Sequence, residues 1–420
     1  MGRRTRKSFV SGAALAALLL FTFAVGTAEA SRVVTRSTAP SEAHARPAQS
    51  DHFRNRPLDE PFQHPGVMLG EQQVAFVKAK LDAGAEPWRS GFKDLKASRY
   101  ASLGWLPKPR AVVECGQSSH PNNGCSDERD DSMAAYTDAL QWLFTRDDRY
   151  AHKAIQIMDA WSAVIQKHTN TNAPLQTGWS GINWARAAEL IRHSEAGWPA
   201  PSVDRFSNML RIAYVPQLAA GSPRKNGNWE LIETDALMSI AVFLDDHQMF
   251  QQAVEMWRDR LPAYVYLKTD GPQPVAPPKA GITGRNALIH YWQGQTTFVN
   301  GLAQETCRDF GHTGWGLEAA AQTAETARLQ GLDLWAEGKQ RLVKALEFHT
   351  SYDNGTKAPG WLCGGAVKSG LGPAVQLAYN HYHLREGIPM PQTQRYVAAH
   401  RSFPANYFIG WETLTDTNAP

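Results

Sequence analysis

Apolar residues recur at intervals of three and four along most of this chain. Two examples are the set Leu140, Leu143 and Phe144 and the set Ala154, Ile157, Met158, Trp161 and Ile165. That spacing places the apolar side chains on one face of an α-helix. It predicts helices over residues 71–81, 131–144, 150–167, 182–193, 203–219, 229–244, 247–266, 317–329, 333–348 and 373–386. Strand-like alternation is nearly absent.

Short and long loops alternate between these predicted helices. The longest gap holds the Gly- and Pro-rich segment 271–284, GPQPVAPPKAGITG, which ends one helical half of the chain. We therefore expect an all-α fold, an (α/α) toroid or incomplete barrel of antiparallel helix pairs. A single domain over residues 63–420 is large, but a toroid reaches that size because adjacent hairpins bury one another.

The first thirty residues have the pattern of a signal peptide. Basic residues between positions 3 and 7 precede an apolar run over 12–25, and Ala28-Glu29-Ala30 offers a small-residue cleavage site. Residues 31–62 are rich in Ser, Ala, Pro and Arg, which is typical of a flexible linker. No second apolar run approaches the ~18 residues that span a bilayer. We expect a secreted protein, extracellular or periplasmic, with no membrane attachment after cleavage.

Charge limits the class of partner, and the cysteines indicate which disulfides can form. Removing residues 1–30 takes four basic residues and one acidic residue from totals of 43 and 40, which leaves 39 of each. A neutral chain argues against a nucleic-acid partner held by a broad basic surface. Of the four cysteines, Cys115 and Cys125 flank a short loop and are the natural disulfide pair in an exported protein. Cys307 and Cys363 form a second pair or remain thiols.

The stretch 284–312 collects residues suited to proton transfer near an anion. Arg285, His290 and Tyr291 lie at its start. If residues 298–312 are helical, one helical face carries four further polar residues, which are Glu305, Arg308, Asp309 and His312. A face of that composition is not typical of a core.

A second polar cluster, residues 225–230 (KNGNWE), precedes the predicted helix 229–244. Asn228 is either the N-cap of that helix or an amide donor to a ligand carboxylate. Asn226 and Trp229 lie beside it. Trp229 is also one of several tryptophans placed at helix or loop edges, where an indole either stacks on a sugar ring or fills a helix interface. The others are Trp105, Trp179, Trp184, Trp292, Trp315 and Trp361.

Three motifs carry a resemblance to a known family. They are residues 226–230 (NGNWE), residues 285–292 (RNALIHYW) and residues 304–313 (QETCRDFGHT), with weaker likeness at 64–67 and 378–382. Together they resemble the alginate-lyase superfamily of polysaccharide lyases. The likeness is closer to polysaccharide lyase family 38 than to family 5, and covers residues 62–400. Family 5 has Asn-Asn-His where this chain has Asn226-Gly227-Asn228. The base assignment of family 5 therefore cannot be applied to this chain, because no histidine occupies that place.

The resemblance implies a toroid that cleaves a uronic-acid polysaccharide by β-elimination. It implies Asn228 as the group that neutralises the C5 carboxylate, Tyr291 as the proton-transfer residue and Arg285 as its activating cation. Arg308 and His312 complete the implied site. His312 or His290 is the alternative base, and which group is base and which acid is open.

The remaining binding residues in this interpretation are Asn226, Trp229, Glu305 and His381, the last of which would line the cleft. The chemistry requires such a set, because a proton next to a carboxylate is acidic enough to remove only when fixed donors neutralise that carboxylate. Tyrosine needs a neighbouring cation to act near neutral pH. We expect an anionic polysaccharide as the partner and a monomer or small homo-oligomer.

Two other functions compete with a lyase. A glycoside hydrolase on the same fold would need two carboxylates, for which Glu230, Asp235, Glu305 and Asp309 are available. A non-catalytic carbohydrate-binding protein would need only aromatic side chains at the rim of a groove. We expect no cofactor and no catalytic metal, since there is no HExxH motif and the acidic run 127–131 lacks the glycine of an EF-hand. That run predicts a solvated helix start.

Overall fold

The computed structural model describes residues 60–401 and 405–420, which lie in one compact unit. The predicted signal peptide and all but the last three residues of the predicted linker lie outside the described residues. The helices are α1 (Glu71–Asp82), α2 (Trp88–Ala97), α3 (Cys125–Thr145), α4 (Asp148–Ser162), α5 (Ala173–Arg192), α6 (Ala200–Met209), α7 (Val215–Ala220), α8 (Gly227–Phe243), α9 (His247–Tyr264), α10 (Arg285–Tyr291), α11 (Phe310–Leu329), α12 (Leu334–Asp353), α13 (Gln376–Tyr379), α14 (Pro391–His400) and α15 (Glu412–Thr415).

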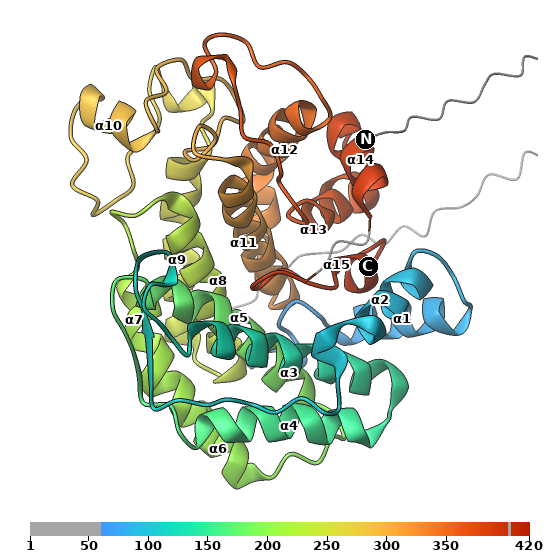
Figure 1. Ribbon diagram of the computed structural model, residues 1–420. Coiled ribbons are helices and arrows are strands. Elements are labelled where there is room, and N and C mark those ends of the chain that lie inside the picture. The colour runs from blue at the N-terminus through green and yellow to red at the C-terminus, as the bar shows by residue number, and fades with distance from the viewer. Residues whose placement is uncertain (1–59, 402–404) are drawn as a thin grey trace, which may run out of the picture. The chain divides into compact units, whose positions relative to one another are not determined.

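Helices α3, α5, α8 and α11 follow one another through the middle of the unit, and each contacts the next. Outer helices cover them: α4 packs on α3, α9 on α8, and α12 on α11 (Figure 1). In α5 every residue except Pro174 and Arg192 is buried, because an inner helix has neighbours on all sides. The structure confirms the predicted all-α architecture, an (α/α) toroid of paired helices.

A small three-stranded sheet lies at one edge of the helical unit. Its strands are β1 (Val112–Cys115), β2 (Asn122–Asn123) and β3 (Lys167–Thr169), in the order β2-β1-β3. Strand β1 pairs antiparallel with β2 and parallel with β3. The predicted disulfide Cys115–Cys125 is confirmed and joins the end of β1 to the start of α3. Cys307 and Cys363 also form a disulfide.

The predicted helix over residues 298–312 is wrong. Residues 298–309 form turns, irregular backbone and an isolated bridge at Ala303, and α11 begins only at Phe310. Asp309 stops the helix from extending backwards, because its carboxylate accepts a hydrogen bond from the backbone N–H of His312 as an N-cap. Gly301 has a φ of +90°, and a Cβ there would lie 2.2 Å from the carbonyl oxygen of Lys344 on α12. The φ of Gly301 lies outside the helical range, so no helix runs through this position.

Other boundaries also differ from the sequence prediction. The structure divides the predicted helix 203–219 into three parts. These are α6, a π-helical turn over Leu210–Tyr214, and α7. The acidic run 127–131 does begin a helix, as predicted, but Glu128 and Asp131 are buried rather than solvated. Helices α2, α10, α14 and α15 and the three strands were not predicted. Among the described residues, no helix combines the length and apolarity that crossing a membrane requires.

Candidate active site

The N-terminal ends of the inner helices meet at one end of the toroid. Trp179 near the start of α5 lies 5.7 Å, between ring centroids, from Trp315 near the start of α11. Asn228 at the start of α8 contacts Glu305 in the loop before α11. Helix N-termini carry partial positive charge and favour an anion. The fold thus concentrates positive potential where the three predicted motifs come together.

Glu305 is the centre of this cluster and is fully buried. Its carboxylate accepts hydrogen bonds from the backbone N–H and the side-chain amide of Asn228, both at 3.1 Å, and from the hydroxyl of Tyr264 at 3.2 Å. It also pairs with the guanidinium of Arg308 at 2.6 Å. Burial raises the pKa of Glu305, although Arg308 acts in the opposite direction. Glu305 holds Asn228 and Arg308 in fixed positions.

Arg308, His312 and Asp309 continue the cluster toward solvent. The guanidinium Nη2 of Arg308 lies 2.9 Å from Nε2 of His312, and Nδ1 of His312 lies 2.8 Å from both carboxylate oxygens of Asp309. Because an arginine nitrogen can only donate, this geometry assigns a lone pair to Nε2 and the proton to Nδ1. Burial alone would raise the pKa of Asp309, but the hydrogen bonds and charges of His312, with that of Arg308, lower it to about 2.

Tyr291 lies at the end of α10, and its hydroxyl contacts a different arginine from the predicted one. Nη1 of Arg260 on α9 donates to the Tyr291 hydroxyl at 2.8 Å, and that hydroxyl donates to the backbone carbonyl of Lys225 at 3.0 Å. Arg260 is fully buried and also pairs with Glu230. Burial raises the pKa of Tyr291 to about 12, with Arg260 opposing the shift.

Gln304 connects Tyr291 to the loop before α8. Its amide nitrogen donates to the backbone carbonyl of Tyr291 at 2.5 Å and to the side-chain oxygen of Asn226 at 3.1 Å. Its amide oxygen accepts from the backbone N–H of Gly227 at 3.0 Å. Since Gln304 immediately precedes Glu305, one short segment holds the asparagine loop, the tyrosine and Arg308 together.

Aromatic rings extend the site away from His312. The ring of Trp315 lies 5.3 Å from His312 and 4.9 Å from Tyr407, and Tyr407 lies 4.7 Å from Trp179. The guanidinium of Arg129 lies over Tyr407 and Trp179, at 4.8 and 5.4 Å. Both Arg129 and Tyr407 line a cavity of about 300 Å³.

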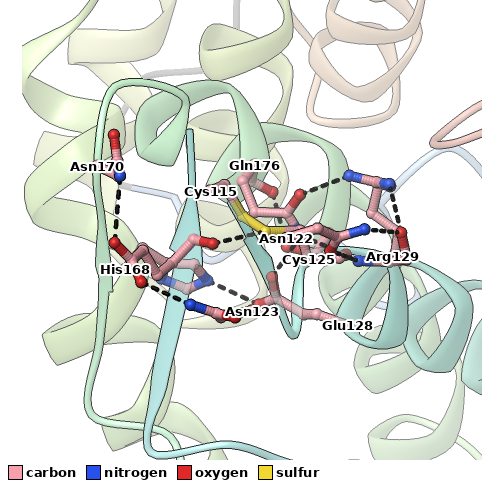
Figure 2. Close-up of a disulfide and its surroundings, with 12 residues drawn as sticks. Cys115, Asn122, Asn123, Cys125, Glu128, Arg129, His168, Asn170 and Gln176 are labelled. Atoms are coloured by element: carbon pink, nitrogen blue, oxygen red, sulfur yellow. Dashed lines mark hydrogen bonds and ion pairs between the residues drawn. A yellow bond between two sulfur atoms is a disulfide. The ribbon is translucent and has the colours of Figure 1, made fainter. Parts of the chain in front are cut away.

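Arg129 is held in place beside the disulfide Cys115–Cys125 (Figure 2). It donates to the side-chain oxygen of Gln176 at 2.9 Å and to the hydroxyl of Ser126 at 3.1 Å. Gln176 in turn donates to the buried carboxylate of Glu128 at 2.6 Å. This network fixes the guanidinium at the edge of the aromatic rings, where an anionic sugar chain would find both a charge and flat apolar faces.

Six of the predicted site residues are brought together by the structure. They are Asn226, Asn228, Trp229, Tyr291, Glu305 and Arg308, and His312 joins them through Arg308. Asn228 is not the N-cap of α8, a place taken by Asn226, but the second residue of the helix. Its side-chain oxygen is buried with no hydrogen-bond partner among the described residues. Trp229 is half-buried and lies under the ammonium of Lys225.

Three further predicted site residues are not joined to this network among the described residues. Arg285 is exposed at the start of α10 and lines a separate hollow with Gln273 and Leu288, so Arg260 takes its predicted place beside the Tyr291 hydroxyl. His290 is exposed on the same short helix. His381 lies elsewhere, because it stacks on Trp335 of α12 and contacts Glu386 at 3.1 Å.

Sequence reasoning missed Arg260, Tyr264 and Arg129. Arg260 and Tyr264 are four residues apart on α9, so the helical spacing alone places them on one face. The sequence feature that could have identified them is an arginine and a tyrosine at buried positions of a helix whose other residues follow the apolar pattern. Arg129 gave no signal, because it belongs to the acidic run 127–131 and its aromatic neighbours are distant in sequence.

The carboxylates that a hydrolase would use are already paired. Glu230 pairs with Arg260, Glu305 with Arg308, and Asp309 with His312. Asp235 is fully buried beside Arg186, and its burial raises its pKa to about 7. A general acid needs a raised pKa and access to substrate. None of these four carboxylates combines the two.

Known proteins resemble this chain in sequence and in fold. A family model described as alginate lyase matches residues 107–359, more than half of the chain. Among solved structures, an alginate lyase from Bacteroides ovatus has 15% sequence identity and a TM-score of 0.55, over 84% of this chain and 99% of that one. Alginate lyase A1-III from Sphingomonas species A1 has 14% identity and a TM-score of 0.54, over 85% and 98%.

A variant of alginate lyase A1-III complexed with tetrasaccharide is also similar, with 14% identity and a TM-score of 0.56 over 85% of this chain and 97% of that one. At such identities the structures establish a shared fold. No curated protein matches the chain significantly.

Proposed function

Because the chain belongs to the alginate lyase family and is therefore a polysaccharide lyase, we propose that it cleaves a uronic-acid polysaccharide, alginate or polymannuronate or glucuronan, by metal-independent β-elimination. The observation that carries this proposal is the chain of contacts from Glu305 through Arg308 and His312 to Asp309, with Tyr291 held beside it by Gln304. It supplies a cation for the carboxylate and two groups for proton transfer.

Arg308 neutralises the C5 carboxylate of the bound uronate, with the amides of Asn226 and Asn228 close by. The Arg308 side chain is 32% exposed while Glu305 anchors it from below, so its outer face is accessible to an anion. In the free site Arg308 also donates to Nε2 of His312. When Arg308 turns to the substrate carboxylate, it releases the lone pair of Nε2.

His312 is the base and Tyr291 the acid in this mechanism. Nε2 of His312 removes the proton from C5, and the carboxylate of Asp309 stabilises the resulting imidazolium through Nδ1. Tyr291 carries its proton at neutral pH, since burial raises its pKa to about 12. On substrate binding this proton turns from the Lys225 carbonyl to the departing O4 oxygen and is transferred to it. The C5–H electrons form the C4–C5 double bond as the C4–O4 bond breaks. Solvent then restores the proton of Tyr291 and removes that of His312.

The test measures ultraviolet absorbance and reducing ends together on alginate, polymannuronate, polyguluronate and glucuronan. Elimination creates an unsaturated uronate, so absorbance and reducing ends should rise in equal molar amounts. A neutral polysaccharide serves as the control and should give neither signal. Reducing ends without absorbance would indicate hydrolysis, and binding without either product would indicate a carbohydrate-binding protein.

We also propose that the chain is exported and that residues 63–420 act as one catalytic domain. The signal-like composition of residues 1–30 and the two disulfides support an oxidising compartment. Expressing the full chain in a bacterial host tests export. Mass spectrometry of the exported product should give an N-terminus near Ser31, and intact residues 1–30 on a retained product would contradict export.

A further inference from the structure

A cluster of possible metal ligands lies at the opposite end of the toroid from the active site. It consists of His64 in the segment before α1, and of Glu189 and His193 at the C-terminal end of α5. Asp245, which follows α8, also contacts His64. Asp245 is 17 residues along the chain from Asn228 at the start of α8, which is about 25 Å at the rise of an α-helix. The cluster is therefore separate from the catalytic residues.

The three ligand groups already face one another. One nitrogen or oxygen atom from each of His64, Glu189 and His193 lies within 4.8 Å of the others. Nδ1 of His64 is 2.6 Å from one carboxylate oxygen of Glu189, and Nε2 of His193 is 3.7 Å from the other. The imidazole rings of the two histidines stack with centroids 4.0 Å apart. Glu189 and His193 share a helical face because they are four residues apart.

Two atoms of this cluster are buried without the hydrogen bond that burial normally requires. They are Oε2 of Glu189, whose side chain is fully buried, and Nε2 of His193. The two atoms face each other at 3.7 Å, and neither has a hydrogen-bond partner among the described residues. An unpaired buried carboxylate oxygen costs free energy. A cation placed between these two atoms and His64 would satisfy both.

The surroundings match those of a bound metal. A metal-binding histidine usually donates its second ring N–H to a carboxylate, and Nε2 of His64 lies 3.0 Å from Asp245. The other oxygen of Glu189 accepts from the backbone N–H of Gly66 at 3.0 Å, which fixes the orientation of the carboxylate. The C-terminal ends of α5 and α8 carry partial negative charge and favour a cation here.

We propose that His64 Nδ1, the carboxylate of Glu189 and His193 Nε2 bind one transition-metal ion of the Zn²⁺ class. Two imidazoles and one carboxylate are ligands that Zn²⁺ accepts, with water in the fourth position. The ion fastens residues 63–66 across the C-terminal ends of the inner helices, where Gln330 also holds this segment by accepting from the backbone N–H of Gln63 at 2.9 Å. Its role is structural, and the elimination reaction proceeds without it.

The test uses purified protein without an affinity tag, stripped with a chelator and titrated with Zn²⁺. Calorimetry should give one Zn²⁺ per chain, and the Tm should rise with Zn²⁺ concentration because the ion binds only the folded form. His193→Ala should weaken Zn²⁺ binding by at least about 100-fold and abolish the Tm shift. Its metal-free Tm should fall only by the small amount that the lost ring stacking on His64 contributes, since Nε2 of His193 makes no hydrogen bond that the substitution removes.

Two further variants complete the test. His152→Ala removes an exposed histidine of α4 and should keep the full Zn²⁺-dependent shift. Glu189→Gln keeps an acceptor for Gly66 but removes the charge, and should lose the shift. The competing interpretation is a protonated His64 shared by Glu189 and Asp245. In that case stripped wild type binds less than about 0.1 Zn²⁺ per chain, or His193→Ala responds like the wild type, and either result overturns the proposal.

Discussion

Arg260 donates a hydrogen bond from Nη1 to the hydroxyl of Tyr291 across 2.8 Å, and this contact joins the buried face of α9 to the short helix α10. The two residues are 31 positions apart. Arg260 is fully buried, so its charge acts on the tyrosine with little screening by solvent. This arrangement holds the Tyr291 hydroxyl in place at the mouth of the toroid. Helix α10 lies there in a segment that extends away from the helical core (Figure 1).

Replacing Tyr291 with Phe should abolish most of the lyase activity. The substitution removes only the hydroxyl that donates a proton to the leaving oxygen, and loss of such a group lowers kcat by about 10²- to 10⁴-fold. The measurement is initial rate by ultraviolet absorbance, with circular dichroism to confirm the fold. Tyr150→Phe is the matched control, because Tyr150 is a half-buried tyrosine of α4 outside the site. A Tyr291→Phe variant with wild-type kcat would remove Tyr291 from the mechanism.

Replacing Arg260 with Lys should lower kcat by about 10- to 100-fold and leave KM within about twofold. An ammonium group cannot reproduce the fork that pairs Arg260 with Glu230 and Tyr291 at once. Arg260 positions Tyr291 and is too deeply buried to touch substrate, which is why KM should hold. Steady-state kinetics on polymannuronate or the best substrate separates the two constants.

Arg258→Lys provides the control for Arg260→Lys. Arg258 lies two residues earlier on α9 and makes an ion pair with Glu337, but its side chain is 42% exposed. Exposed pairs of this kind contribute little, so both kcat and KM should stay at wild-type values. Equal effects of the two substitutions would mean that Arg260 acts through the stability of α9 and not through Tyr291.

The sequence predicted the helical framework well because apolar periodicity reports on burial directly. It also placed Glu305, Arg308 and His312 together, but for the wrong reason, since a capped turn and not a helix brings them into contact. It could not identify Arg260 as the partner of Tyr291. Spacing relates only residues close in sequence, and this contact depends on the packing of the loop after α9 against α8.

The contacts of His381 also could not be predicted from the sequence. A histidine beside a tyrosine, in a stretch with only a weak resemblance to the family, was expected in the cleft, yet the structure pairs it with Trp335 and Glu386. Arg285 was expected to be the activating cation because the family resemblance implies that role, and it is exposed. Motifs identify residue types that matter, whereas their contacts depend on tertiary structure.

Replacing Asp309 with Asn should reduce activity while keeping the fold. Asparagine caps a helix about as well as aspartate, so the hydrogen bond from the His312 backbone survives. At neutral pH the variant loses only the stabilisation that the charged carboxylate gains beside His312 and Arg308. The neutral amide no longer stabilises an imidazolium, so kcat should fall by about 10²-fold. Asp309→Ala is the comparison, since it should lose a similar factor in kcat and also about 1 kcal/mol of stability with the cap.

Asp309 also predicts a pH dependence of stability. Its pKa in the folded protein is lowered to about 2 from an ordinary value of 3.8. The unfolded chain therefore binds the proton first as pH falls, so the stabilisation is complete above about pH 4 and is lost as the pH approaches 2. Urea unfolding along this range should show wild-type stability falling more steeply than that of Asp309→Asn. Parallel pH profiles for the two proteins would mean that the Asp309 carboxylate is not held in its charged form.

Replacing Arg129 with Met should raise KM for long substrates and leave kcat unchanged. Arg129 lies over Trp179 and Tyr407 and lines the 300 Å³ cavity beyond His312, so it is placed to bind a uronate distant from the bond that breaks. Methionine keeps much of the apolar contact and removes the charge. Loss of one such contact corresponds to about a tenfold rise in KM on polymer, with a weaker dependence on salt.

Arg149→Met, which removes an exposed arginine of α4 paired with Asp147, should change neither constant. A short substrate that cannot reach Arg129 should give the same KM with Arg129→Met as with wild type, and an equal loss on short and long substrates would place Arg129 outside the binding groove.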